Sequence, residues 1–116
     1  VIFSLQTSNS TFHISSDAST VVSGANNSIV LGIWQLFIAT READGTTNVY
    51  VNGVLSGSAD RDSGTPVTGS TNIFIGNRSD QARTFYGLIG NTRIENGILS
   101  SAQAMQVYTS EVGYYE

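Results

Sequence analysis

Apolar and polar residues alternate in short runs along most of the chain, which is the pattern of β-strands. Residues 1–6 and 10–15 alternate with a period of two, so we predict two strands joined by a polar turn. Residues 16–27 carry only one apolar pair, Val21-Val22, and indicate either a loop or a weakly paired segment. Residues 29–40, IVLGIWQLFIAT, are apolar on both faces; their length and β-branched content favour a strand buried on both sides over a helix, which periodicity alone does not exclude.

Two turn signals follow. Asp44-Gly45 and Asn52-Gly53 each stand between runs rich in β-branched and aromatic residues, and such dipeptides favour tight hairpins because both accept a left-handed backbone. The sequence therefore predicts a three-strand meander over about residues 34–58.

The next segment has longer polar loops. Residues 59–71 hold the only Pro and no apolar cluster, and they precede a short predicted strand at 72–76, NIFIG. A second polar loop, 77–84, leads to residues 85–97, which are interpreted as a long strand interrupted by glycines.

The pattern changes near the end of the chain. Ser100 is a good N-cap, and residues 102–110 predict a short helix with an apolar stripe at Ala102, Met105, Val107 and Tyr108. Many short strands followed by one helix favour an antiparallel β-sandwich.

Composition narrows the classes of partner. The chain has 116 residues, the size of one domain, with five Arg, no Lys, nine acidic residues and a net charge of -4. No basic surface for nucleic acid is expected, and no apolar run is long enough for membrane insertion. Because there is no Cys, neither a disulfide framework nor a thiolate metal site can form.

Four blocks of sequence occur in a familiar order: Trp34 with FIAT, then NVYVNGVLSGS, then NIFIGN, then FYGLIGNTRIENGILSSAQ. Over roughly residues 30–110 the chain resembles the C-terminal part of the laminin G-like, concanavalin A-like lectin-glucanase family. The resemblance implies an all-β, antiparallel jelly-roll β-sandwich with a short C-terminal helix. Because Trp34 opens a run that is apolar on both faces, we expect it in the core, with an exposed sugar-binding ring as the alternative. Family domains have further strands before the part that matches residues 1–6, so we expect residues 1–116 to be a single laminin G-like domain that lacks its N-terminal strands and is a fragment of a larger domain or chain.

The resemblance implies less about function, since the superfamily includes lectins, adhesion modules, glucanases and viral surface domains. Our main hypothesis is a non-catalytic recognition or adhesion module that binds glycan or protein on an extracellular, cell or virion surface. The alternative is a structural subunit, a virion shell, fibre or decoration protein, whose sandwich is completed by other chains of a larger assembly. Where the family usually carries an acidic pair, this chain has Gly90-Asn91.

Catalysis is not expected. Glycoside hydrolysis needs two carboxylates at a fixed separation, whereas Glu95 stands alone and Glu42 and Asp44 flank a hairpin. His13 is the only histidine, and no nucleophile elbow accompanies it. We therefore predict that the protein is not an enzyme.

The second polar loop supplies a candidate ligand site. Sugars present apolar C–H faces and paired hydroxyls, which suit an aromatic ring beside polar groups. The candidate residues, all close in sequence, are Asn77, Arg78, Asp80, Arg83 and Tyr86. The alternative is that Phe85 and Tyr86 begin a core strand while the arginines are solvated.

A candidate calcium site combines both polar loops. Asp60, Asp62 and Asp80 would supply the carboxylate oxygens that calcium prefers if the fold brings the loops to one rim. The alternative is that both loops are simply solvated.

Overall fold

The strands of the computed structural model form two three-stranded antiparallel sheets. The structure describes residues 2–5, 10–13, 21–60, 72–77 and 80–115. The chain divides into two compact units, one made of Val1–Thr65 with Ile98–Glu116 and the other of Pro66–Gly97. Every strand and helix of the described residues belongs to the first, larger unit.

The first sheet has the order β1-β2-β3, with strands β1 (Ile2–Leu5), β2 (Ser10–His13) and β3 (Val21–Ser23). The two N-terminal strands that the alternation predicts are confirmed in this sheet. The third strand lies in the stretch interpreted as a loop or a weakly paired segment, and the second of these interpretations is confirmed for residues 21–23. This strand forms because Val21 and Val22, the one apolar pair of that stretch, pair with the end of β2.

The second sheet has the order β4-β5-β6, with strands β4 (Phe37–Arg41), β5 (Thr46–Val51) and β6 (Val54–Asp60). It confirms the predicted meander, and both turns follow from local chemistry. Asn52 and Gly53 have φ angles of 51° and 78°, the left-handed conformation that Asn and Gly adopt most readily. In the first turn the Thr46 backbone N–H donates to Asp44 Oδ1 at 2.9 Å.

The two sheets meet at an irregularity in β6. The register shifts between Val49, opposite Gly57, and Tyr50, opposite Leu55, so Ser56 is an extra residue in its strand. Ser56 Oγ accepts a hydrogen bond from the Ala25 backbone N–H at 2.9 Å, just beyond β3. The bulge thereby joins one sheet to the other.

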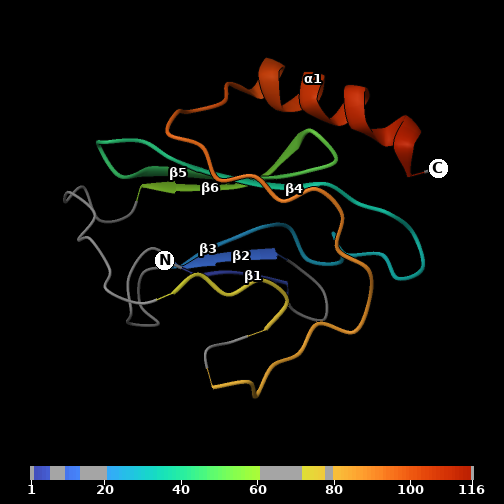
Figure 1. The fold of residues 1–116 in the computed structure, drawn as a ribbon. Coiled ribbons are helices and arrows are strands. Elements are labelled where there is room, and N and C mark those ends of the chain that lie inside the picture. Colours follow the sequence, from blue (N-terminus) through green and yellow to red (C-terminus); the bar gives the residue numbers. More distant parts are fainter. Residues whose placement is uncertain (1, 6–9, 14–20, 61–71, 78–79, 116) are drawn as a thin grey trace. The chain divides into compact units, whose positions relative to one another are not determined.

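A small apolar core lies beside this junction. Val22 of β3 and Val49 of β5 are buried in one cluster, and Ala59 packs against them. In Figure 1 the β4-β5-β6 sheet lies between the β1-β2-β3 sheet and the C-terminal helix. This arrangement is consistent with the concanavalin A-like β fold that the resemblance implies.

Helix α1 (Ser101–Glu111) begins where the sequence predicts. Ser100 Oγ accepts from the Gln103 N–H, and Gln103 Oε1 accepts from the Ser100 N–H, so the two residues form a capping box. The predicted apolar stripe is wrong in part. Ala104, which it omits, is the buried residue of α1, whereas Ala102 and Met105 are exposed. A short helix η1 (Val112–Tyr114) follows.

The predicted strand over residues 29–40 begins only at Phe37. The preceding residues form a loop because Gly32 adopts a φ of 81° and the Gln35 side chain bonds back to the main chain. Gln35 Oε1 accepts from the Val30 N–H at 2.7 Å, and Gln35 Nε2 donates to the Ser28 carbonyl at 2.9 Å. We call residues 28–36 the Trp34 loop.

The strands predicted at 72–76 and 85–97 are not present among the described residues 72–77 and 80–97 of the smaller unit. One backbone hydrogen bond, from the Phe85 N–H to the Gly76 carbonyl at 2.8 Å, joins these two segments. A strand needs a continuous partner, and a single bond does not make a ladder.

Candidate functional site

The predicted ligand residues lie around one loop of the smaller unit, which we call the Asn77 loop (residues 76–86, of which 78 and 79 are outside the described residues). Gly76 turns the chain into the loop with a φ of 78°, and its carbonyl accepts the hydrogen bond from Phe85 on the far side. The two ends of the loop are therefore held together by their own backbone.

The Asn77 side chain crosses the same loop. Its Oδ1 accepts from the Arg83 N–H at 3.2 Å, and its Nδ2 donates to Thr84 Oγ1 at 3.2 Å. Both ends of the amide are thus engaged with the opposite arm. In this structure Asn77 positions Arg83 and the residues that follow it.

Asp80 shapes the tip of the loop. Its Oδ1 accepts from the Ala82 N–H at 3.0 Å, the local hydrogen bond of an Asx turn, and Gln81 between them has a φ of 60°. A carboxylate in this role stabilises the turn that leads to Arg83.

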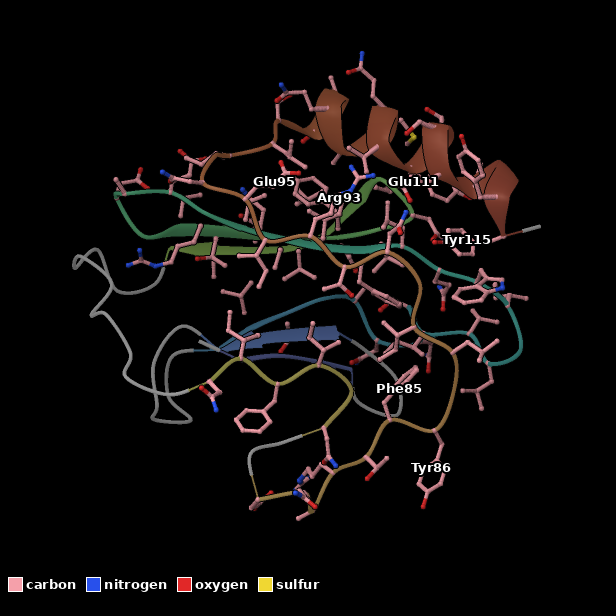
Figure 2. All side chains as sticks on the ribbon, in the orientation of Figure 1. Phe85, Tyr86, Arg93, Glu95, Glu111 and Tyr115 are labelled. Carbon is pink, nitrogen blue, oxygen red and sulfur yellow. The ribbon has the colours of Figure 1, made fainter. Side chains whose placement is uncertain are left out.

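Tyr86 follows directly after this braced segment. Its side chain is 96% exposed and points away from the ribbon in Figure 2, while Phe85 is 42% exposed. The alternative that Phe85 and Tyr86 begin a core strand is therefore wrong for Tyr86. The loop presents one phenol ring and the exposed Arg83 within a few residues of each other. Arg78, the remaining predicted ligand residue, lies outside the described residues.

The predicted calcium site is not tested by this structure. Asp62 lies outside the described residues, and Asp60 is the last residue of β6, with a side chain that is not described. Within the described part of the chain, no group of three His, Cys, Asp or Glu side chains is placed to hold a metal ion. The calcium site stays a prediction.

Among the titratable groups of the described residues, the Asp44 carboxyl has a shifted pKa. Hydrogen bonds from the Thr46 backbone N–H and the Thr46 hydroxyl lower the pKa of the Asp44 carboxyl below its ordinary value. A general acid needs the opposite shift, because it must hold its proton near neutral pH. Asp44 is consequently suited to capping the turn rather than to protonating a leaving group.

A second exposed aromatic surface was not predicted. Trp34, expected in the core, is 41% exposed, and its ring lies 4.6 Å from that of Tyr115, centroid to centroid, at an angle of 40°. The Trp34 loop is held in place by Gln35 and by Asn52, whose Oδ1 accepts from the Leu36 N–H at 2.9 Å. No local sequence signal predicts this pair, because its members are far apart in the sequence.

Comparison with known families gives the class of the protein. The family model Laminin_G_3, described as the concanavalin A-like lectin/glucanases superfamily, matches residues 1–105. The chain belongs to this family, and the resemblance noted in the sequence is confirmed. A search of curated proteins found no significant match.

A solved structure shares the fold. The chain is similar to an S-layer domain-containing protein (residues 221–444) from Clostridium thermocellum ATCC 27405, with a TM-score of 0.61 and 18% sequence identity. The match covers 77% of this chain and 51% of that one, so the chain spans about half the length of this neighbour. Separately, no helix in the described part of the chain has the length and apolar character needed to cross a bilayer.

Proposed function

We propose that this protein is a non-catalytic recognition module, built on a jelly-roll β-sandwich, that binds glycan or protein through the Asn77 loop. One observation carries the proposal. The Asn77 amide ties together the two arms of a loop that presents Tyr86 almost fully to solvent. A braced loop with an outward aromatic ring is the arrangement a rigid binding surface needs, because little conformational entropy is lost on binding.

The chemistry of this loop suits a glycan. The face of a phenol ring packs on the C–H face of a pyranose, and the Arg83 guanidinium offers several N–H donors to hydroxyl or carboxylate oxygens. Arg83 and Tyr86 are both exposed, so neither needs to leave a packed position to bind.

The absence of catalysis is also a proposal. The superfamily name covers both lectins and glucanases, so membership alone does not decide. Gly90-Asn91 stands where relatives usually carry carboxylates. Asp44 is a poor general acid, because its lowered pKa makes its carboxyl give up its proton more readily. These two features favour binding without hydrolysis.

A location on the cell surface or outside the cell is supported by comparison. The structural neighbour is named as an S-layer domain-containing protein, and the family name includes lectins. Calcium at Asp60, Asp62 and Asp80 remains part of the proposal as an accessory ion.

A glycan array tests the proposal. The wild-type chain is expected to give saturable binding to a defined group of glycans, and Tyr86→Ala to abolish it. Tyr114→Ala is the matched control, since Tyr114 is 83% exposed in the larger unit and should leave binding unchanged. Repeating the array with a chelator and with added calcium tests the ion. Equal binding by wild type and Tyr86→Ala would contradict the proposed site.

The second candidate function is a structural subunit completed by neighbouring chains. The observation that favours it is the Trp34 loop, in which Leu31 is 90% exposed and Ile33 is 59% exposed although the loop is held by side-chain hydrogen bonds. This function predicts that the particle mass, measured by light scattering, exceeds that of one chain and falls for Leu31→Ser. A monomer at all concentrations would contradict it.

A further inference from the structure

The chain contains two Asn-Gly dipeptides, Asn52-Gly53 and Asn96-Gly97. We propose that Asn96 is a site of spontaneous deamidation and backbone isomerisation, and that the fold protects Asn52 from the same reaction. The two sites have the same local sequence chemistry, so the difference between them must come from their surroundings.

The reaction is intramolecular. The backbone nitrogen of the glycine attacks Cγ of the preceding Asn, a C–N bond forms, and the side-chain nitrogen leaves as ammonia to give a cyclic succinimide. Water then opens the ring at either carbonyl and yields aspartate or isoaspartate. Glycine favours the first step because it has no Cβ to hinder the approach of its nitrogen.

The Asn52 side chain is held by a hydrogen bond that restrains it from turning toward the Gly53 nitrogen. Its Oδ1 accepts from the Leu36 N–H at 2.9 Å, and its own N–H donates to the Leu36 carbonyl at 2.8 Å. Its left-handed φ of 51° is fixed by the hairpin turn. To cyclise, the side chain must break its hydrogen bond and rotate.

Gly53 is also confined. It is buried beneath helix α1, and a Cβ built at this glycine would stand 2.8 Å from Met105 Cα and 3.0 Å from Tyr108 Cβ. Because Gly53 packs this closely against α1, its backbone has little space in which to change conformation as the ring closes. Deamidation at Asn52 therefore requires local opening of the fold.

Asn96-Gly97 has none of these restraints. Both residues are exposed, and no described residue makes a hydrogen bond to the Asn96 side chain. A Cβ built at Gly97 would meet no atom within 4 Å, so Gly97 is not packed against another part of the described chain as Gly53 is. The dipeptide lies at a bend and is the last of the Pro66–Gly97 unit.

The product has two physical consequences. Deamidation replaces a neutral amide with a carboxylate and makes the net charge more negative than -4. In the isoaspartate form the main chain runs through Cβ of residue 96, so the backbone gains one carbon. This extra carbon lies at the end of the smaller unit, just before Ile98.

Peptide mapping of aged protein tests the inference. Trypsin cleaves after Arg41, Arg61 and Arg93, so Asn52 and Asn96 fall on different peptides, 42–61 and 94–116. In folded protein kept at mildly alkaline pH, the mass shift of amide-to-acid conversion should accumulate at Asn96 at least tenfold faster than at Asn52. A tenfold difference corresponds to about 1.4 kcal/mol of opening free energy at Asn52.

Two further experiments separate the effect of the fold on the deamidation rate from the effect of the local sequence. In denaturant the two sites should convert at similar rates, and Gly97→Ala should slow conversion at Asn96 several-fold while leaving the fold intact, since its Cβ has open space. Equal rates in the folded protein, or no conversion at Asn96, would overturn the inference.

Discussion

The Ser23 carbonyl oxygen of β3 occupies the place where a Cβ at Gly57 of β6 would stand. Only a glycine at position 57 allows the two backbones to approach so closely, and the neighbouring Ser56 adds a hydrogen bond to Ala25 across the same junction. The contact between the sheets therefore depends on two residues at the bulge: Ser56 provides its side-chain oxygen as a hydrogen-bond acceptor, and Gly57 lacks the side chain that would block the approach.

We expect Gly57→Ala to lower the free energy of unfolding by about 1 to 3 kcal/mol, the usual cost of overpacking, because backbone atoms must move. Chemical denaturation measures the change. Gly113→Ala is the control, since a Cβ there meets nothing within 4 Å and the unfolding free energy should stay the same within about 0.5 kcal/mol. Equal effects of the two substitutions would show that the sheets do not meet at Gly57.

The contact of helix α1 with the hairpin turn can be isolated by comparing two glycines. Gly53 and Gly32 both have left-handed φ angles, 78° and 81°, so an alanine at either costs about 1 to 2 kcal/mol of backbone strain. Only at Gly53 does the new Cβ also collide with Met105 and Tyr108.

Gly53→Ala should consequently destabilise the protein more than Gly32→Ala, and hydrogen exchange should show faster opening of α1 in Gly53→Ala alone. If the two variants have the same unfolding free energy and the same helix protection, α1 does not pack on this turn.

We expect the stability of the hairpin turn at Asp44 to depend on pH. The pKa of Asp44 is lowered in the folded protein, so the unfolded chain binds a proton more readily. The stabilisation is present above the ordinary pKa and is lost as the pH falls through the lowered one, from about pH 5 downward. NMR titration of the Asp44 carboxyl should give a midpoint below its ordinary value of 3.8. Asp44→Asn should remove this part of the acid sensitivity; an unchanged acid profile would exclude the turn as its source.

The contact between Trp34 and Tyr115 can be followed by fluorescence, because Trp34 is the only tryptophan. Removing the Tyr115 ring should shift the emission toward that of a hydrated indole and lower stability by about 0.5 to 1.5 kcal/mol, the range for an aromatic pair. Tyr114→Ala removes a neighbouring exposed ring and should leave the emission unchanged. Identical spectra for the Tyr115→Ala and wild-type proteins would contradict the contact.

The features that could be predicted from the sequence are those set by nearest neighbours. Asn52-Gly53 and Asp44-Gly45 determine their turns through backbone conformation and a local side-chain bond, and Ser100 with Gln103 determines the start of α1. Each of these signals lies within a few residues of the structure it determines.

The features that sequence reasoning missed depend on distant partners. The bulge at Ser56 exists where β3 approaches, and the exposed ring of Trp34 contacts that of Tyr115, which is distant in the sequence. Apolar alternation over 72–76 and 85–97 predicted strands that are not present in the described residues. Alternation gives a segment one apolar face, but a strand also needs a neighbouring strand that pairs with its backbone. For the candidate site, clustering in sequence located the loop but did not reveal that Asn77 braces it.

NMR titration of the isotope-labelled protein with the glycan that binds best on the array shows whether the Asn77 loop is the binding surface. Saturable shifts of the amides of residues 80–86 are predicted, and Asn77→Ala should weaken binding because Arg83 and Tyr86 lose their support. Asn72→Ala, an exposed asparagine of the same unit, should bind like wild type. Shifts confined to the Trp34 loop and Tyr115, or equal affinity of the wild-type and Asn77→Ala proteins, would show that the ligand does not bind at the Asn77 loop.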